Sequence, residues 1–163
     1  MTHPAMVLPE AMKNLQALGA VIHAAGLPAS TIGLVELRAS QINGCSVCLD
    51  MHYRMMKRAG ESDERLATVA AWRDAPYFTD AERAALALTE ALTRLSDRSD
   101  PIPDDLWLEA TRHYDEERLA GLLLLISTIN VWNRLNAATR QVAGEWIKSA
   151  EAKEWSERQP AAV

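Results

Sequence analysis

Apolar residues recur at helical spacing along this chain, in segments separated by glycines, prolines and polar stretches. Pro9 opens the first segment, and Gly26 with Pro28 closes it. Within this segment, apolar side chains stand three or four positions apart, at Met12, Leu15, Leu18 and Ile22. Because that interval places side chains on one face of an α-helix, the pattern predicts a helix here. A second helix is predicted from about Ser30 to Ile42.

The Asn43-Gly44 pair interrupts the helical pattern and separates two predicted helices. The third helix is predicted to start at Cys45 and to end at Gly60, because glycine readily adopts the left-handed conformation found at helix ends. Ser62 or Asp63, which follow directly, can cap a fourth helix.

The stretch from Trp72 to Phe78 contains a proline and is predicted to connect two helices. The next residues, Thr79-Asp80-Ala81-Glu82, have the Thr-x-x-Glu form of a capping box, which predicts a helix start. The helix that follows is predicted to carry one apolar stripe, made of Ala84, Leu88, Ala91, Leu92 and Leu95. Ser96 to Pro103 is predicted to be a loop, and the helical pattern resumes at Asp104.

The last strong helical segment runs from Arg118 to about Trp132 and is apolar on nearly every side. Asp115-Glu116-Glu117 precedes it and supplies negative charge at the positive end of the helix dipole. Such a helix lies in the core or has one side against another subunit, and the core is favoured. Trp132 to Asn136 is polar enough to predict a kink or interruption, and the tail past Trp155 is predicted to fray.

Composition favours a helical protein with one core. The 27 Ala and 20 Leu residues outnumber the 24 Val, Ile and Thr residues together, and β-branched residues are the ones that lose most rotamer freedom in a helix. A length of 163 residues fits a single domain over 1–163. A domain of this size buries enough surface to fold without a disulfide framework or a structural metal.

Charge and hydropathy exclude several classes of function. The net charge is −5, and no dense Lys/Arg cluster is available for a nucleic-acid backbone. The longest apolar run, Leu119 to Ile129, is far shorter than the ~20 residues that span a bilayer. Met1 to Ala11 lacks the features of a secretory signal, so a cytoplasmic location is predicted. In that reducing compartment, a close cysteine pair is more often catalytic or metal-binding than structural.

The candidate chemistry is concentrated at Cys45, Cys48 and His52. At 100° per residue, these three positions share one face of a helix. Cys45 and Cys48 are predicted to lie in or near the first turn, where free N–H groups and the helix dipole favour a thiolate. A thiolate is the nucleophilic form of cysteine, and a second thiol nearby can capture a sulfenic acid as a disulfide.

Three other interpretations of the cysteines stay open. Either cysteine can be a small buried apolar residue. Cys-x-x-Cys with His52 supplies three of the four ligands of zinc, and His23 or His113 would complete the site only through the tertiary fold. A thioredoxin-like motif would need a βαβ context, which this chain does not offer.

Glu36 lies nine residues before Cys45, on the preceding predicted helix. A turn at Asn43-Gly44 could fold that helix back beside the cysteine helix. The neighbours of Glu36 are apolar, so its carboxylate is expected to be partly buried. A partly buried carboxylate is suited to proton transfer.

The run from Glu36 to His52, ELRASQINGCSVCLDMH, resembles the core motif of AhpD-like alkylhydroperoxidases in the carboxymuconolactone decarboxylase family. The similarity continues through Gly60-Glu61, Glu82 to Leu95 and Ile129 to Leu135, and so covers about residues 10–145. It implies an all-α, AhpD-like domain that assembles as a homotrimer or hexamer. It also implies a hydroperoxide substrate, no metal or organic cofactor, and regeneration by an external dithiol or a thiol-carrying protein.

The resemblance also implies roles for individual residues. Cys48 is the cysteine that attacks the peroxide, Cys45 resolves it, and His52 relays protons with a glutamate. In mycobacterial-type members that glutamate falls twelve residues before the first cysteine, a position that is Gly33 here. Glu36, one helical turn nearer, is the candidate replacement. Decarboxylase members lack the cysteine pair, so a lactone decarboxylase is not expected. The alternative function is a non-enzymatic metal-binding or oligomeric interaction module that uses Cys45, Cys48 and His52.

Overall fold

The computed structural model describes residues 1–95, 99–145 and 148, and within them every regular element is helical. This confirms the all-α prediction for the part of the chain described. The elements, in chain order, are α1 (Pro4–Val7), α2 (Pro9–Ala24), α3 (Ala29–Asn43), α4 (Ser46–Arg58), α5 (Asp63–Thr68), the 3-10 helix η1 (Val69–Ala71), α6 (Asp80–Thr93), α7 (Asp104–His113) and α8 (Glu116–Ala138). None of these helices is both long and apolar enough to cross a membrane.

Several helix starts follow the predicted capping residues. Ser62 caps α5 by accepting a hydrogen bond from the backbone N–H of Arg65. Thr79 and Glu82 form both halves of the predicted capping box at α6. The acidic residues predicted to favour the helix dipole at α8 also begin the helix: Asp115 caps it, and α8 starts at Glu116, two residues before the predicted start at Arg118. Each of these interactions spans only three residues, so it forms as soon as the first helical turn does.

The structure corrects two predictions about helix ends and adds one short helix. The polar stretch from Trp132 to Asn136 does not interrupt the last helix, because α8 continues to Ala138. Leu95 does not extend the apolar stripe of α6, since the helix ends at Thr93 and Leu95 is exposed. The short helix α1 was not predicted. Residues 96–98 of the predicted loop and the tail past Trp155 lie outside the described residues.

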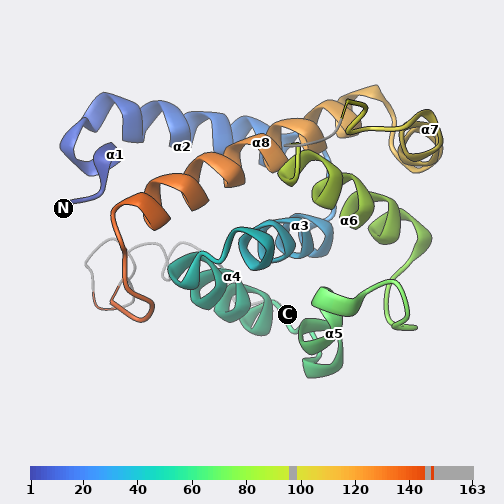
Figure 1. The fold of residues 1–163 in the computed structure, drawn as a ribbon, viewed down its shortest axis with the longest axis horizontal. Helices are drawn as coiled ribbons and strands as arrows, with labels where there is room; N and C mark the ends of the chain where they lie inside the picture. Colours follow the sequence, from blue (N-terminus) through green and yellow to red (C-terminus); the bar gives the residue numbers. More distant parts are fainter. Residues whose placement is uncertain (96–98, 146–147, 149–163) are drawn as a thin grey trace.

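Helix α3 is central and packs against α4, α6 and α8, while α2 and α8 run side by side (Figure 1). Residues of α3 take part in two apolar clusters. One joins α3 to α2, α6, α7 and α8, and includes Val35 and Leu122. The other joins α3 to α4 and the segment from α5 to α6, and includes Leu34 and Met56. Most apolar residues from Leu119 to Ile129 are buried, which confirms the core placement, although Leu124 is exposed.

A buried carboxylate ties α3 to α6. Glu90 on α6 accepts hydrogen bonds from Arg38 of α3 at 2.6 and 2.8 Å and from the indole of Trp72 at 3.0 Å. Arg73 lies 2.9 Å from the other carboxylate oxygen. Burial raises the pKa of Glu90, but the hydrogen bonds from Trp72, Arg38 and Arg73 outweigh it and lower the pKa to about 2. The cluster therefore holds Glu90 in its charged form.

Replacing Glu90 with glutamine is expected to destabilise the fold by about 3 to 5 kcal/mol, because it leaves the buried charge of Arg38 uncompensated. A carboxyl whose pKa falls from 4.5 to about 2 on folding stabilises the protein fully above pH 4.5 and loses that effect as pH falls toward 2. Urea unfolding at pH 7 and pH 3 should show a smaller acid loss in Glu90→Gln than in the wild type. Glu10→Gln, at an exposed position, is the control; an equal acid loss in wild type and Glu90→Gln would contradict the prediction.

Candidate functional site

The cysteines lie at a tight turn between α3 and α4. Gly44 ends α3 in the left-handed conformation, with φ of 66°, which glycine adopts without steric strain. The carbonyl of Ser40 then accepts hydrogen bonds from the backbone N–H groups of both Gly44 and Cys45. This turn sets α4 beside α3. The helix was predicted to start at Cys45, but Cys45 has an extended backbone and is the N-cap of α4, which begins one residue later at Ser46.

Cys45 and Cys48 are joined as a disulfide, with sulfur atoms 2.08 Å apart and Cα atoms 5.3 Å apart. Both are buried. Within the described part of the chain, each sulfur has one hydrogen-bond donor: the backbone N–H of Cys48 lies 3.4 Å from Cys45 Sγ, and Nδ2 of Asn136 lies 3.3 Å from Cys48 Sγ. The disulfide therefore closes a local loop with a sequence separation of 3 and does not link distant parts of the chain.

His52 and Glu36 are brought together as the sequence suggested. Glu36 Oε2 lies 3.0 Å from His52 Nδ1, the distance of an ion pair, although its direction does not meet hydrogen-bond geometry. The His52 side chain is 4% exposed and that of Glu36 is 17% exposed, which confirms that Glu36 is partly buried. His52 Nε2 is buried and has no hydrogen-bond partner among the residues that the structure describes. This leaves one ring nitrogen available for a proton or a ligand.

Close packing surrounds Gly33 on α3. A Cβ atom added at Gly33 would lie 2.8 Å from Met56 Cγ and 3.0 Å from its sulfur. A longer side chain at position 33 would therefore require Met56 to move. One helical turn along α3, Glu36 faces His52, which lies one turn before Met56 on α4. The carboxylate beside His52 therefore comes from Glu36.

The zinc interpretation gains no further ligand from the fold. His23 is exposed on α2, and His113 pairs with Glu109 of its own helix at 3.0 Å. Among the described residues, no group of three or more His, Cys, Asp or Glu side chains is placed to hold a metal ion.

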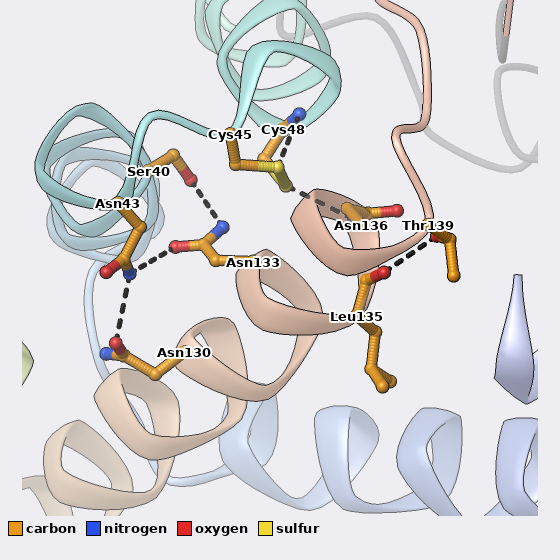
Figure 2. The surroundings of a disulfide bond; sticks show 9 residues. All are labelled: Ser40, Asn43, Cys45, Cys48, Asn130, Asn133, Leu135, Asn136 and Thr139. Atoms are coloured by element: carbon orange, nitrogen blue, oxygen red, sulfur yellow. Dashed lines mark hydrogen bonds between the residues drawn. A yellow bond between two sulfur atoms is a disulfide. The ribbon is translucent and has the colours of Figure 1, made fainter.

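Sequence reasoning missed a row of asparagines on α8. Asn130, Asn133 and Asn136 are three residues apart, so they lie along one side of the helix. Figure 2 shows this row facing the turn that carries the cysteines. The three-residue spacing was visible in the sequence, but the polar stretch was interpreted as a break in the helix. In the structure, Asn133 instead forms hydrogen bonds with Asn43 and Ser40, and Asn136 donates one to Cys48.

The fold and this site together place the chain among all-helical proteins that carry a closely spaced pair of cysteines at the start of a helix. More particularly, the chain belongs to the carboxymuconolactone decarboxylase family, whose sequence model matches residues 9–91. This match confirms the family resemblance that was inferred from the motif.

Two curated relatives extend the match beyond the family motif. The uncharacterized protein YdfG of Bacillus subtilis (strain 168) is 34% identical over 132 residues, which are 81% of this chain and 88% of YdfG. The uncharacterized protein YnjA of Escherichia coli (strain K12) is 37% identical over 106 residues, which are 64% of this chain and 56% of YnjA.

Solved structures show the same fold. A protein of unknown function from Agrobacterium tumefaciens, described provisionally as the antioxidant defence protein AhpD, aligns with a TM-score of 0.79 and 34% identity, over 85% of this chain and 94% of its own. The debrominase Bmp8 aligns with a TM-score of 0.74 and 21% identity, over 84% of this chain and 73% of its own. The Agrobacterium structure supports the AhpD-like fold. Bmp8, at its lower identity, shows a shared fold alone.

Proposed function

We propose that this protein is a thiol-dependent hydroperoxide reductase. The observation that carries the proposal is the buried Cys45–Cys48 disulfide, with the buried His52 one helical turn after Cys48 and paired with the partly buried Glu36. A dithiol that closes within one helical turn can store two electrons without a metal or an organic cofactor. An imidazole and a carboxylate in the same site can supply the proton transfers that peroxide cleavage requires.

The reaction begins with the Cys48 thiolate attacking one peroxide oxygen. A sulfur–oxygen bond forms, the O–O bond breaks, and the departing alkoxide takes up a proton as an alcohol. Cys48 is then a sulfenic acid. The Cys45 thiol attacks that sulfur, the disulfide forms, and the hydroxyl leaves as water. An external dithiol, such as a reducing cytoplasm contains, returns both cysteines to thiols and is itself oxidised to a disulfide.

Cys48 is assigned as the attacking residue because it has the nearer base. His52 is one helical turn from Cys48, and it can accept the thiol proton and deliver it to the leaving oxygen. Cys45 has a competing advantage, since its sulfur accepts the N–H of Cys48 at the positive end of α4. That interaction is fixed, whereas a titrating imidazole can act in both proton transfers. The order of the two thiols is therefore the part of the proposal that variants must test.

The proposal is tested by titrating thiols before and after one equivalent of hydroperoxide, with metal analysis of the same sample. A peroxidase should contain two reactive thiols when reduced, lose both after one equivalent, and recover them with a dithiol. Stoichiometric zinc bound by protein that ignores peroxide would support the metal-binding module instead. Two thiols that stay reduced in metal-free protein would support a packing or interaction role.

We also propose a homotrimeric or hexameric assembly. Beyond the family resemblance, it is supported by exposed apolar side chains on the adjacent helices α2 and α8, namely Val21, Leu124 and Val131. Light scattering at micromolar concentration should give three or six times the mass of one chain. A stable monomer would contradict the assembly while leaving the fold unaffected.

A further inference from the structure

We propose that Asn136 stabilises the Cys48 thiolate by donating a hydrogen bond to it from α8. This inference rests on the proposed function, because it assigns the reactive sulfur to Cys48. Asn136 Nδ2 lies 3.3 Å from Cys48 Sγ, a contact between residues 88 positions apart in the sequence. Figure 2 shows the amide of Asn136 reaching the sulfur from the helix opposite α4.

The chemistry of the contact fixes which end of the amide faces sulfur. A disulfide sulfur carries no hydrogen, so it can only accept, and the amide presents its N–H. When the disulfide is reduced and Cys48 ionises, the same N–H meets a full negative charge. Hydrogen bonds to charged groups are roughly twice as strong as those between neutral groups. The contact is therefore stronger with the thiolate than with the disulfide.

A network of buried and partly buried amides holds the segment of α8 just before Asn136 against the end of α3. Asn43, at the end of α3, donates from Nδ2 to Oδ1 of Asn130 at 3.0 Å and of Asn133 at 2.9 Å. Asn133 donates in turn to the hydroxyl of Ser40 at 3.0 Å. Because the carbonyl of Ser40 also holds the backbone of Cys45, α8 is tied to the very turn that carries the cysteines. The donor is thus positioned before the thiolate forms, which is what electrostatic stabilisation requires.

The same hydrogen bond would direct the regeneration step. A thiolate of the external reductant attacks one sulfur of the disulfide and expels the other as a thiolate. Thiol–disulfide exchange is faster when the leaving thiolate is the more stable one. Attack at Cys45 forms a mixed disulfide there and expels the Cys48 thiolate, which Asn136 stabilises. The mixed disulfide with the reductant is therefore expected on Cys45.

The decisive experiment measures the reactivity of Cys48 alone, in a Cys45→Ser background. Alkylation by iodoacetamide as a function of pH gives the midpoint at which the thiolate forms. Adding Asn136→Leu should move that midpoint up by about one pH unit or more, and slow alkylation at neutral pH about tenfold, since a hydrogen bond to a charged group is lost. Adding Asn136→Asp, which is nearly isosteric, should move it further up through repulsion between like charges.

Asn14→Leu is the matched control. It makes the same substitution at an exposed asparagine of α2, outside this network, so it should leave the alkylation midpoint unchanged. An unchanged alkylation midpoint in both Asn136 variants would overturn the inference, as would an equal shift in Asn14→Leu. If Asn136→Leu does not fold, Asn136→Asp decides the question.

The result separates from the test of the proposed function, because alkylation needs no peroxide. A raised midpoint in a protein that ignores hydroperoxides would support the thiolate contact and refute the peroxidase. A protein that reduces hydroperoxides, but whose alkylation midpoint does not move in the Asn136 variants, would support the peroxidase and refute the thiolate contact.

Discussion

Replacing Cys48 with serine is expected to abolish the reaction with hydroperoxide, since the attacking sulfur is lost. In the wild type, one equivalent of peroxide should produce an intramolecular disulfide, seen by mass spectrometry as a loss of two hydrogens with no lasting oxygen adduct. In Cys45→Ser, attack should still occur, but without a resolving thiol Cys48 should proceed to the sulfinic acid. Multiple turnovers with a dithiol should stop in both variants.

The two single variants also decide the order of the thiols. If Cys45→Ser stays fully reduced while Cys48→Ser accumulates the oxygen adduct, then Cys45 is the attacking residue. That outcome would mean that the helix N-terminus at Cys45 stabilises a thiolate more than the surroundings of Cys48 do. It would leave the peroxidase proposal intact and reverse the two roles.

Replacing His52 with glutamine is expected to slow single-turnover oxidation of Cys48 by roughly 10²-fold or more, the usual scale for losing a general acid–base residue. Glutamine keeps some hydrogen-bonding capacity but cannot accept and release a proton during the reaction. The loss should therefore appear in the pH profile as well as in the rate. His23→Gln makes the same substitution at an exposed histidine and should leave both unchanged.

Glu36→Gln distinguishes two uses of the carboxylate. If Glu36 mainly orients His52, the variant should slow oxidation less than His52→Gln does. If Glu36 delivers a proton itself, the two losses should be comparable. A pH profile identical to the wild type in both variants would assign His52 and Glu36 to packing, with the cysteine pair acting alone.

Local features of the sequence were enough to predict the helical architecture and most of its helix starts. The capping residues Ser62, Thr79 and Asp115 contact backbone groups within three residues. The break at Asn43-Gly44 was likewise readable from residue type, because glycine tolerates a left-handed backbone. Interactions of this range depend on few other parts of the chain, so a pattern in the sequence carries most of the information.

The interpretation of α8 failed for the opposite reason. Trp132 to Asn136 contains polar side chains that, taken alone, predict a surface or a break. In the structure Asn133 is fully buried and bonds Asn43 and Ser40, which are about 90 residues away. A buried polar group is stable only when it is hydrogen-bonded, and those partners are supplied by the packing of α3 against α8.

The sequence by itself therefore determined the helical class, the family motif and the close spacing of Cys45, Cys48 and His52 along one short segment. The sequence suggested that the helix of Glu36 could fold back beside the cysteine helix, but only the tertiary structure placed the Glu36 carboxylate 3.0 Å from His52. It also decided that Asn136 reaches the sulfur of Cys48. Spacing along a helix is set by local backbone geometry, whereas contacts between helices depend on the side-chain volumes and polar partners that the whole fold brings together.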